Sequence, residues 1–148
     1  RPNSASIGTR AYQLALYVVF ESNLQMMSDN PTLYNMYPDC RDYIAGCPVN
    51  WDETRVLAAE FGQYTVVARR KGSKWYIGGI TNETARDITV KLDFLTEGKS
   101  YRTTSFTDAV NSEKQAMDYR KKEGQTKKDD ALSIHMVRNG GFAAVLEP

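Results

Sequence analysis

The sequence is poor in the residues from which most active sites are built: its 148 residues include one histidine and two cysteines. A structural zinc site takes about four ligands, so these side chains alone cannot complete one. No nucleophile elbow, phosphate-binding loop or Ser-His-Asp arrangement is visible either. The single histidine, His135, lies opposite the apolar residues of a predicted strand, which indicates a surface position. We therefore expect no catalytic, cofactor-binding or metal-binding residue in this chain, and no cofactor bound to it.

The sequence also lacks an excess of one charge and a long apolar run. It has 19 basic and 18 acidic residues and a formal net charge of +1, which gives no electrostatic footprint for nucleic acid or an anionic membrane. The longest apolar run, Ala11–Phe20, is much shorter than the roughly 20 residues that span a bilayer. The chain begins without a signal-peptide pattern and without methionine, so we expect it to be a piece of a longer precursor.

The most informative segment is the apolar run near the start. Between Ala11 and Phe20 only Gln13 is polar, and Thr9 is placed to cap a helix. A surface helix shows one apolar stripe, whereas this helix is apolar nearly all round and needs partners on most of its circumference. A second run, Leu24–Met27, predicts a buried strand. Because the rest of the chain has the pattern of an all-β protein, we expect the helix to lack a partner within this chain and to exchange its amides rapidly.

A polar connection, residues 29–52, follows. Within it, Asp39–Ala45 predicts one or two helical turns, with Asp39 as the cap and a stop at Gly46-Cys47-Pro48. Cys40 and Cys47 are interpreted as two unpaired thiols near a loop. A local disulfide remains open as an alternative, because cysteines at this spacing can meet across a turn.

From residue 53 onward the apolar residues alternate with a period of two, which is typical of strands. We predict about seven short antiparallel strands, a number and spacing that favour a β-sandwich: Thr54–Glu60, Gln63–Lys71, Lys74–Asn82, Arg86–Leu95, Tyr101–Asp108, Ala131–Arg138 and Gly141–Glu147. Turn residues at Gly72 and at Asn139-Gly140-Gly141 indicate hairpins. The adjacent Gly78 and Gly79 suggest a bulge or a close approach by another backbone.

The stretch Ser112–Asp130 is rich in charges of both signs that nearly cancel. A surface that binds polyanions needs an excess of positive charge, which this stretch does not supply. We interpret it as a solvated loop or an edge strand.

Two weaker signals point to carbohydrate. Glycoside hydrolysis uses a pair of carboxylates, and Glu21 and Asp29 follow the apolar helix and the apolar strand. Taken alone, an acid at such a position is more often a cap or a turn residue. The second signal is aromatic: side chains that could stack on sugar rings are Trp51, Tyr64, Trp75 and Tyr76. Because Trp75 and Tyr76 are neighbours in one strand, at most one of them faces the surface.

Several unrelated blocks occur in a recognisable order: TRAYQLALYVVFESNLQMMSDNP, a cysteine in a short polar helix, WDETRVLAAEFGQYTVVARRKGSKWYIGGITNETARDITVKLDFL, FTDAVN, DYRKK and GGFAAVLEP. Together they resemble the C-terminal part of glycoside hydrolase family 97, bacterial α-glucosidases and α-galactosidases typical of gut Bacteroidetes. The resemblance implies a parent enzyme with an N-terminal β-sandwich, a catalytic (β/α)8 barrel that uses calcium, and a C-terminal β-sandwich. It also implies a periplasmic or outer-membrane-associated location in a Gram-negative bacterium.

The resemblance assigns residues 1–50 to the end of the barrel and the connection, and residues 51–148 to the C-terminal sandwich. A complete barrel takes about 250 residues, so the catalytic glutamates and calcium ligands are expected upstream. We therefore expect this chain to be inactive alone, to buttress the barrel of the same protein and to join subunits into a homo-oligomer. The alternative is a carbohydrate-binding β-sandwich module, which needs a flat exposed patch with Trp75 or Tyr76 and takes an oligosaccharide as its partner.

Overall fold

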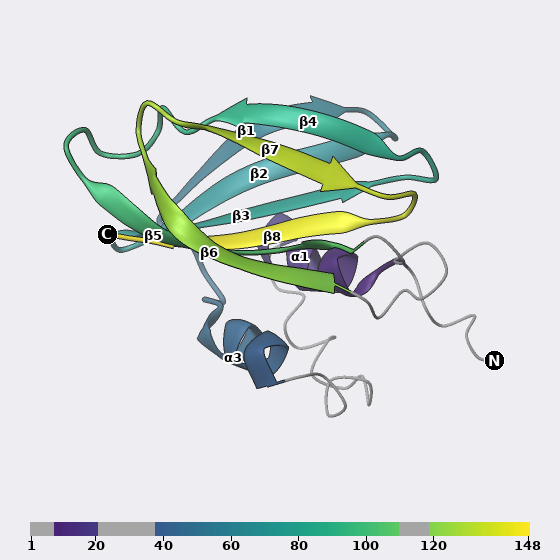
Figure 1. Ribbon diagram of the computed structural model, residues 1–148, viewed down its shortest axis with the longest axis horizontal. Coiled ribbons are helices and arrows are strands. Elements are labelled where there is room, and N and C mark those ends of the chain that lie inside the picture. The colour runs from purple at the N-terminus through teal and green to yellow at the C-terminus, as the bar shows by residue number, and fades with distance from the viewer. Residues whose placement is uncertain (1–7, 21–37, 110–118) are drawn as a thin grey trace.

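The computed structural model describes residues 8–20, 38–109 and 119–148. These residues form two helices and eight strands (Figure 1): α1 Arg10–Val19, α3 Pro38–Gly46, β1 Glu53–Glu60, β2 Tyr64–Lys71, β3 Lys74–Thr81, β4 Arg86–Lys91, β5 Ser100–Asp108, β6 Tyr119–Lys127, β7 Ala131–Met136 and β8 Gly141–Glu147. Within the described part of the chain, no helix is long and apolar enough to cross a membrane.

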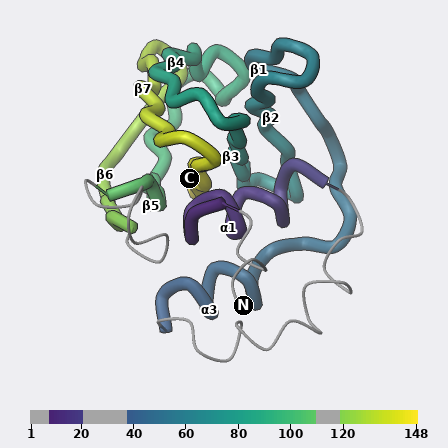
Figure 2. Tube along the Cα trace, turned by 90° about the vertical axis from the view of Figure 1, so that its right-hand side faces the viewer, coloured from purple at the N-terminus to yellow at the C-terminus, as the bar shows by residue number. Residues whose placement is uncertain are grey.

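The strands form two unequal antiparallel sheets. The large sheet has the order β1-β2-β3-β8-β5-β6, and the small sheet pairs β4 with β7. The small sheet covers one face of the large sheet, and the helices lie on the other side (Figures 1 and 2). The predicted antiparallel β-sandwich is confirmed, with a helical layer added to it.

The central strands of the large sheet are buried on both faces. In β3, Trp75 and Ile77 belong to the core between the sheets, whereas Tyr76 belongs to a second core beneath the helices. The same alternation places Phe142 of β8 in the first core and Ala143 in the second. The two-sided burial explains why residues 75–80 of β3 and 141–146 of β8 are all apolar or glycine, in contrast to a strand that exposes one face to solvent.

Helix α1 has its main partner within this chain. It begins at the expected cap, where the Thr9 hydroxyl oxygen accepts a hydrogen bond from the Tyr12 amide at 3.1 Å. Ala11, Leu14 and Ala15 are fully buried, and α1 packs chiefly on β3 and β8. The expectation that this helix has no partner here is therefore wrong, because the large sheet presents a second apolar face. The strand predicted at Leu24–Met27 lies outside the described residues.

Two glycines let the backbone of α1 approach the sheet. A Cβ atom at Gly78 would lie 2.8 Å from the Val18 Cβ and 2.9 Å from the Ala15 carbonyl oxygen. A Cβ atom at Gly141 would lie 2.5 Å from the Tyr12 Cα. The close approach by another backbone predicted from the paired glycines is confirmed at Gly78, where the neighbour is the helix.

Several boundaries differ from the sequence prediction. The charge-rich segment Tyr119–Lys127 forms β6, the edge strand beside β5. The interpretation of Ser112–Asp130 as an edge strand is therefore correct for this segment. The turn at Asn139-Gly140 is not a hairpin, because it leads from β7 in the small sheet to β8 in the large sheet. Strand β4 ends at Lys91, before a turn in which the Leu95 amide donates to the Leu92 carbonyl oxygen at 3.0 Å.

Amide hydrogen exchange of the isolated chain tests the position of α1. We expect protection over Ala11–Val18 comparable to that of β3, since α1 is buried against one face of the large sheet and packs directly on β3. Exchange within seconds over α1, beside a protected β3, would contradict the helix packing described above.

The glycine contact with α1 predicts a destabilising substitution. Gly78→Ala places a methyl group against the helix backbone, and overpacking of this kind lowers the free energy of unfolding by about 1–3 kcal/mol. A methyl group added at Gly124 on β6 would meet no atom within 4 Å, so Gly124→Ala is the matched control and should change stability by less than about 0.5 kcal/mol. Urea denaturation of both variants measures the difference; equal stabilities would contradict the close contact.

Candidate interaction site that holds helix α1 on the large sheet

Two charged side chains of the large sheet hold the two ends of α1. Asp108 stands at the end of β5 beside the helix N-terminus, and Arg69 stands in β2 beside the helix C-terminus. A helix carries partial positive charge at its N-terminus and partial negative charge at its C-terminus. Each side chain therefore has the sign that favours its own end, and we call the pair the helix clamp.

Asp108 connects the helix cap to the turn before β8. One carboxylate oxygen accepts a 2.6 Å hydrogen bond from the Thr9 hydroxyl, which in turn accepts from the Tyr12 amide. The other oxygen accepts from the amides of Val137 and Gly141 at 2.8 and 3.2 Å. Burial raises the pKa of the Asp108 carboxyl above its ordinary value of 3.8, while these hydrogen bonds act in the opposite direction.

Arg69 satisfies carbonyl oxygens at the other end of α1. Its Nε donates to the Val18 carbonyl oxygen, and its Nη2 donates to that of Val19 at 2.9 Å. Its Nη1 donates to the Thr54 hydroxyl at 2.8 Å, which ties β1 to the same group. The last carbonyl groups of a helix have no partner within the helix, so this buried guanidinium acts as a C-terminal cap supplied by the sheet.

The helix clamp is not found by the sequence prediction. The sequence does contain a sign that Arg69 is buried. It follows Val66-Val67-Ala68 in a strand whose apolar residues indicate burial on both faces, so a charge there needs a partner. Asp108 stands at the end of a predicted strand, where an acid is common, and carries no comparable signal. Glu21 and Asp29, the two acids considered for catalysis, lie outside the described residues.

His135 is a surface residue, as predicted. Its Nδ1 lies 2.6 Å from the Asp87 carboxylate, and the two side chains are 59% and 84% exposed. It borders an open cleft of about 560 Å³, which Arg120 and Lys122 also line. Among the residues that the structure describes, Asp108 is the one carboxylate lining this cleft, and the helix clamp already engages it. The described lining therefore lacks the two opposed acids that glycoside hydrolysis needs.

The aromatic residues proposed to stack on sugars are engaged within the protein. Trp75 and Tyr76 are 4% and 3% exposed, so a flat exposed patch built on either residue is wrong: both faces of their strand are covered. The half-buried Trp51 packs on Tyr76, with ring centroids 5.1 Å apart. The guanidinium of Arg86 lies over the Tyr64 ring, 4.9 Å from its centroid.

Both cysteines are buried free thiols, so their interpretation as two unpaired thiols is correct and the alternative of a local disulfide is wrong. Cys47 follows α3, and burial raises its thiol pKa to about 12, which keeps it protonated and unreactive. The predicted helix at Asp39–Ala45 is confirmed as α3. Asp39 lies inside its first turn rather than at the cap, and its carboxylate accepts a 2.6 Å hydrogen bond from the Tyr119 hydroxyl.

Metal ligands are not gathered in the part of the chain that the structure describes. Among residues 8–20, 38–109 and 119–148, no group of three or more His, Cys, Asp or Glu side chains could hold a metal ion. Calcium takes six to eight oxygen ligands, so the described residues do not fit a calcium ion such as the one that the family resemblance implies for the upstream barrel.

Comparison with known proteins identifies the family. The family model described as "Glycosyl-hydrolase 97 C-terminal, oligomerisation" matches residues 50–147. The chain belongs to glycoside hydrolase family 97. The matched residues include all eight strands and exclude both helices, so the resemblance stated from the sequence is confirmed. This family 97 chain is a C-terminal part of such a protein.

Curated relatives extend the match to the helices. The chain is 49% identical over 138 residues to a retaining alpha-galactosidase of Bacteroides thetaiotaomicron, covering 93% of this chain. It is 34% identical over 146 residues to a probable retaining alpha-galactosidase of Streptomyces bingchenggensis, covering 98% of this chain. The chain spans about a fifth of the length of either relative, since it covers 21% of each.

A solved structure has the same arrangement of elements. A glycoside hydrolase family 97 enzyme from Pseudoalteromonas sp. strain K8, in complex with panose, matches with a TM-score of 0.82 and 27% identity. The match covers 99% of this chain and 23% of that enzyme. The sandwich with its helical layer is thus the architecture of the corresponding part of a larger enzyme.

The helix clamp predicts the effect of substitutions at Asp108. Asp108→Ala leaves two buried amides and the Thr9 hydroxyl without their acceptor, and we expect a loss of about 2–4 kcal/mol in the free energy of unfolding. Asp108→Asn keeps one acceptor oxygen and should cost less. Asp87→Ala removes an exposed acid and should change stability by less than about 0.5 kcal/mol. Similar losses for Asp108→Ala and Asp87→Ala in urea denaturation would contradict the clamp.

The raised pKa of Asp108 gives this group an unusual pH dependence. Because burial raises the pKa of Asp108 above its ordinary value of 3.8, the folded protein holds this proton more tightly than the unfolded chain does. The part of the stability that comes from binding this proton is therefore greatest in acid and is lost as the pH rises through the raised pKa. The stability of the native chain relative to Asp108→Asn should decline as the pH rises from about 4 through the raised pKa; an increase with pH would show a lowered pKa instead.

Proposed function

We propose that this chain is the non-catalytic C-terminal part of a glycoside hydrolase that acts on α-galactosides. The observation that carries the proposal is the 49% identity, over 93% of the chain, to a retaining alpha-galactosidase. The panose-bound family 97 enzyme is less similar, at 27% identity. This difference favours α-galactosides over α-glucosides as the substrates of the whole protein, and it favours retention of configuration.

The mechanical role that we propose is to buttress the catalytic barrel. We assign residues 1–50 to the end of that barrel, as the family resemblance implies, and α1 belongs to this segment. Because the helix clamp and the contact at Gly78 fix α1 on the large sheet, a barrel that includes α1 would share the helix with the sandwich. The sandwich would then hold the last barrel element in place through a buried surface rather than through a flexible linker.

We also propose that the domain joins copies of the enzyme into a homo-oligomer. The matched family description names oligomerisation for residues 50–147, the segment that forms both sheets. The calcium ion, which would supply a Lewis acid to the reaction, is assigned to the upstream barrel together with the catalytic carboxylates. A Gram-negative source and a periplasmic or outer-membrane-associated location belong to the same proposal.

Hydrolysis of aryl α-glycosides by the full-length protein tests the activity, with the isolated chain as the control. We expect the full-length protein to cleave the α-galactoside with a higher kcat/KM than the α-glucoside, and to lose activity when calcium is chelated. The isolated chain should release no aryl alcohol, because the described residues place no opposed pair of acids in the cleft beside His135. Turnover by the repurified isolated chain would overturn the non-catalytic role, and a preference for the α-glucoside would overturn the substrate assignment.

A further inference from the structure

We infer that the outer edge of β1 is the surface through which two copies of this protein contact each other. The inference rests on the oligomerisation proposed above and names the surface that carries it. The residues concerned are Val56 and Ala59 of β1 and Phe61 in the turn after it, which we call the β1 patch. All three are exposed.

The β1 patch leaves large apolar side chains in water. Phe61 has a relative accessibility of 104% and Val56 of 65%. Val56 pairs in register with Val67, which is only 5% exposed on the same face of the sheet, so the apolar surface continues from the covered core to the open edge. Burying a phenylalanine or valine side chain is favourable, and this gain is not realised within the described part of the chain.

The two edges of the large sheet differ in how they meet solvent. The edge strand β6 carries Arg120, Lys121, Lys122 and Lys127, and such charges disfavour contact between edges. In β1 the four residues from Val56 to Ala59 are all apolar. A bulge at Leu57 interrupts the register with β2 and disfavours a continuous ladder with another strand. We therefore expect the two copies to meet mainly through side chains.

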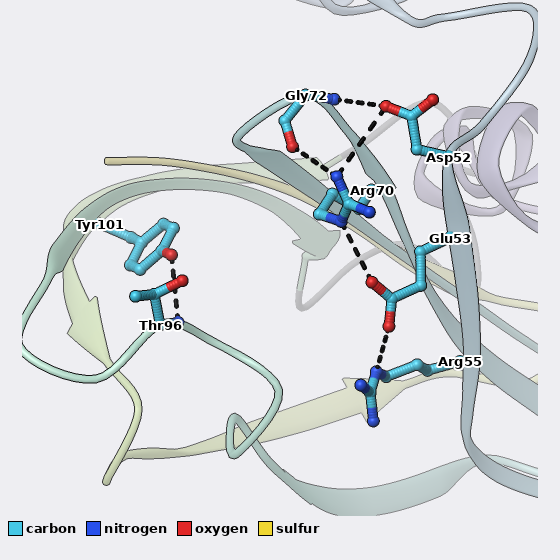
Figure 3. Close-up of polar contacts among 7 residues, drawn as sticks. All are labelled: Asp52, Glu53, Arg55, Arg70, Gly72, Thr96 and Tyr101. Carbon is cyan, nitrogen blue, oxygen red and sulfur yellow. Dashed lines mark hydrogen bonds and ion pairs between the residues drawn. The ribbon is translucent and has the colours of Figure 1, made fainter.

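Charges at the two ends of the apolar section favour a second copy as the partner. Figure 3 shows Arg55 and Arg70 on either side of Glu53, with bonds of 2.8 and 3.1 Å. The basic Arg55 thus stands at one end of the section, and the acidic Glu60 stands at the other. A two-fold axis between Leu57 and Ala58 would place Arg55 of each copy opposite Glu60 of the other. A surface that is complementary to itself in this way suits a symmetric dimer.

The family model covers the β1 patch but not the helices. Its description names oligomerisation, and the residues that it matches, 50–147, contain the whole β1 patch. It excludes α1 and the exposed Phe20 at the end of that helix. Phe20 is therefore the matched control: it is a second exposed phenylalanine, outside the segment to which the family description applies.

The experiment is light scattering of the full-length protein at about 1 µM, near the dissociation constants of moderately stable complexes. Val56→Ser combined with Phe61→Ser should raise the dissociation constant about tenfold or more, because central apolar anchors dominate such contacts. Phe20→Ser should leave the oligomer intact. Circular dichroism and activity on the aryl α-glycoside confirm that each variant is folded.

Charge exchange provides an independent arm. Arg55→Glu should weaken the oligomer, and Arg55→Glu combined with Glu60→Arg should restore it, because the pair across the axis is then reversed rather than lost. If the unaltered full-length protein is a monomer, the oligomerisation proposed above fails together with this surface. If it is an oligomer that the Val56 and Phe61 substitutions leave unchanged, the β1 patch alone is wrong.

Discussion

The structure depends on the contact between α1 and the outer face of the large sheet. Without that contact, apolar side chains of β2, β3 and β8 would be exposed on one face, and a helix that is apolar nearly all round would lose its main partner. The contact requires glycine at two places: Gly78 admits the helix backbone near Val18, and Gly141 admits it near Tyr12. Backbone proximity, more than side-chain bulk, therefore sets the distance between the layers.

Electrostatics orients the helix that packing brings close. Asp108 and Arg69 come from strands on opposite sides of the β3–β8 pair, and each engages one end of α1. Apolar contact between a helix and a sheet is not directional, whereas these hydrogen bonds fix which end of the helix lies where. Asp108 also accepts from the amides of Val137 and Gly141, so the crossover between the two sheets and the helix position are specified by one carboxylate.

This arrangement is consistent with the supporting role proposed above for the domain within a larger enzyme. Each face of the large sheet is covered by one of the two cores. The aromatic residues considered for a sugar-binding surface are buried there, Trp75 in one core and Tyr76 in the other. Among the described residues, the exposed parts of the helical layer and the edge strand β1 remain available for interaction. A buttress on one side and a contact between copies at the other are consistent with that division.

The sequence by itself determined the local features, because these depend on neighbouring residues. The cap at Thr9, the alternation of Trp75 and Tyr76, the surface position of His135 and the close approach at Gly78 were all predictable, and the ordered blocks of the chain were sufficient to recognise the family. Only the tertiary structure decided which segments meet. The partner of α1, the strand pairing of the charged β6 and the place of β7 in a separate sheet depend on contacts between residues far apart in the chain. Asp108 and Arg69 have their roles for the same reason, since a charge becomes a cap only where the fold brings a helix end to it.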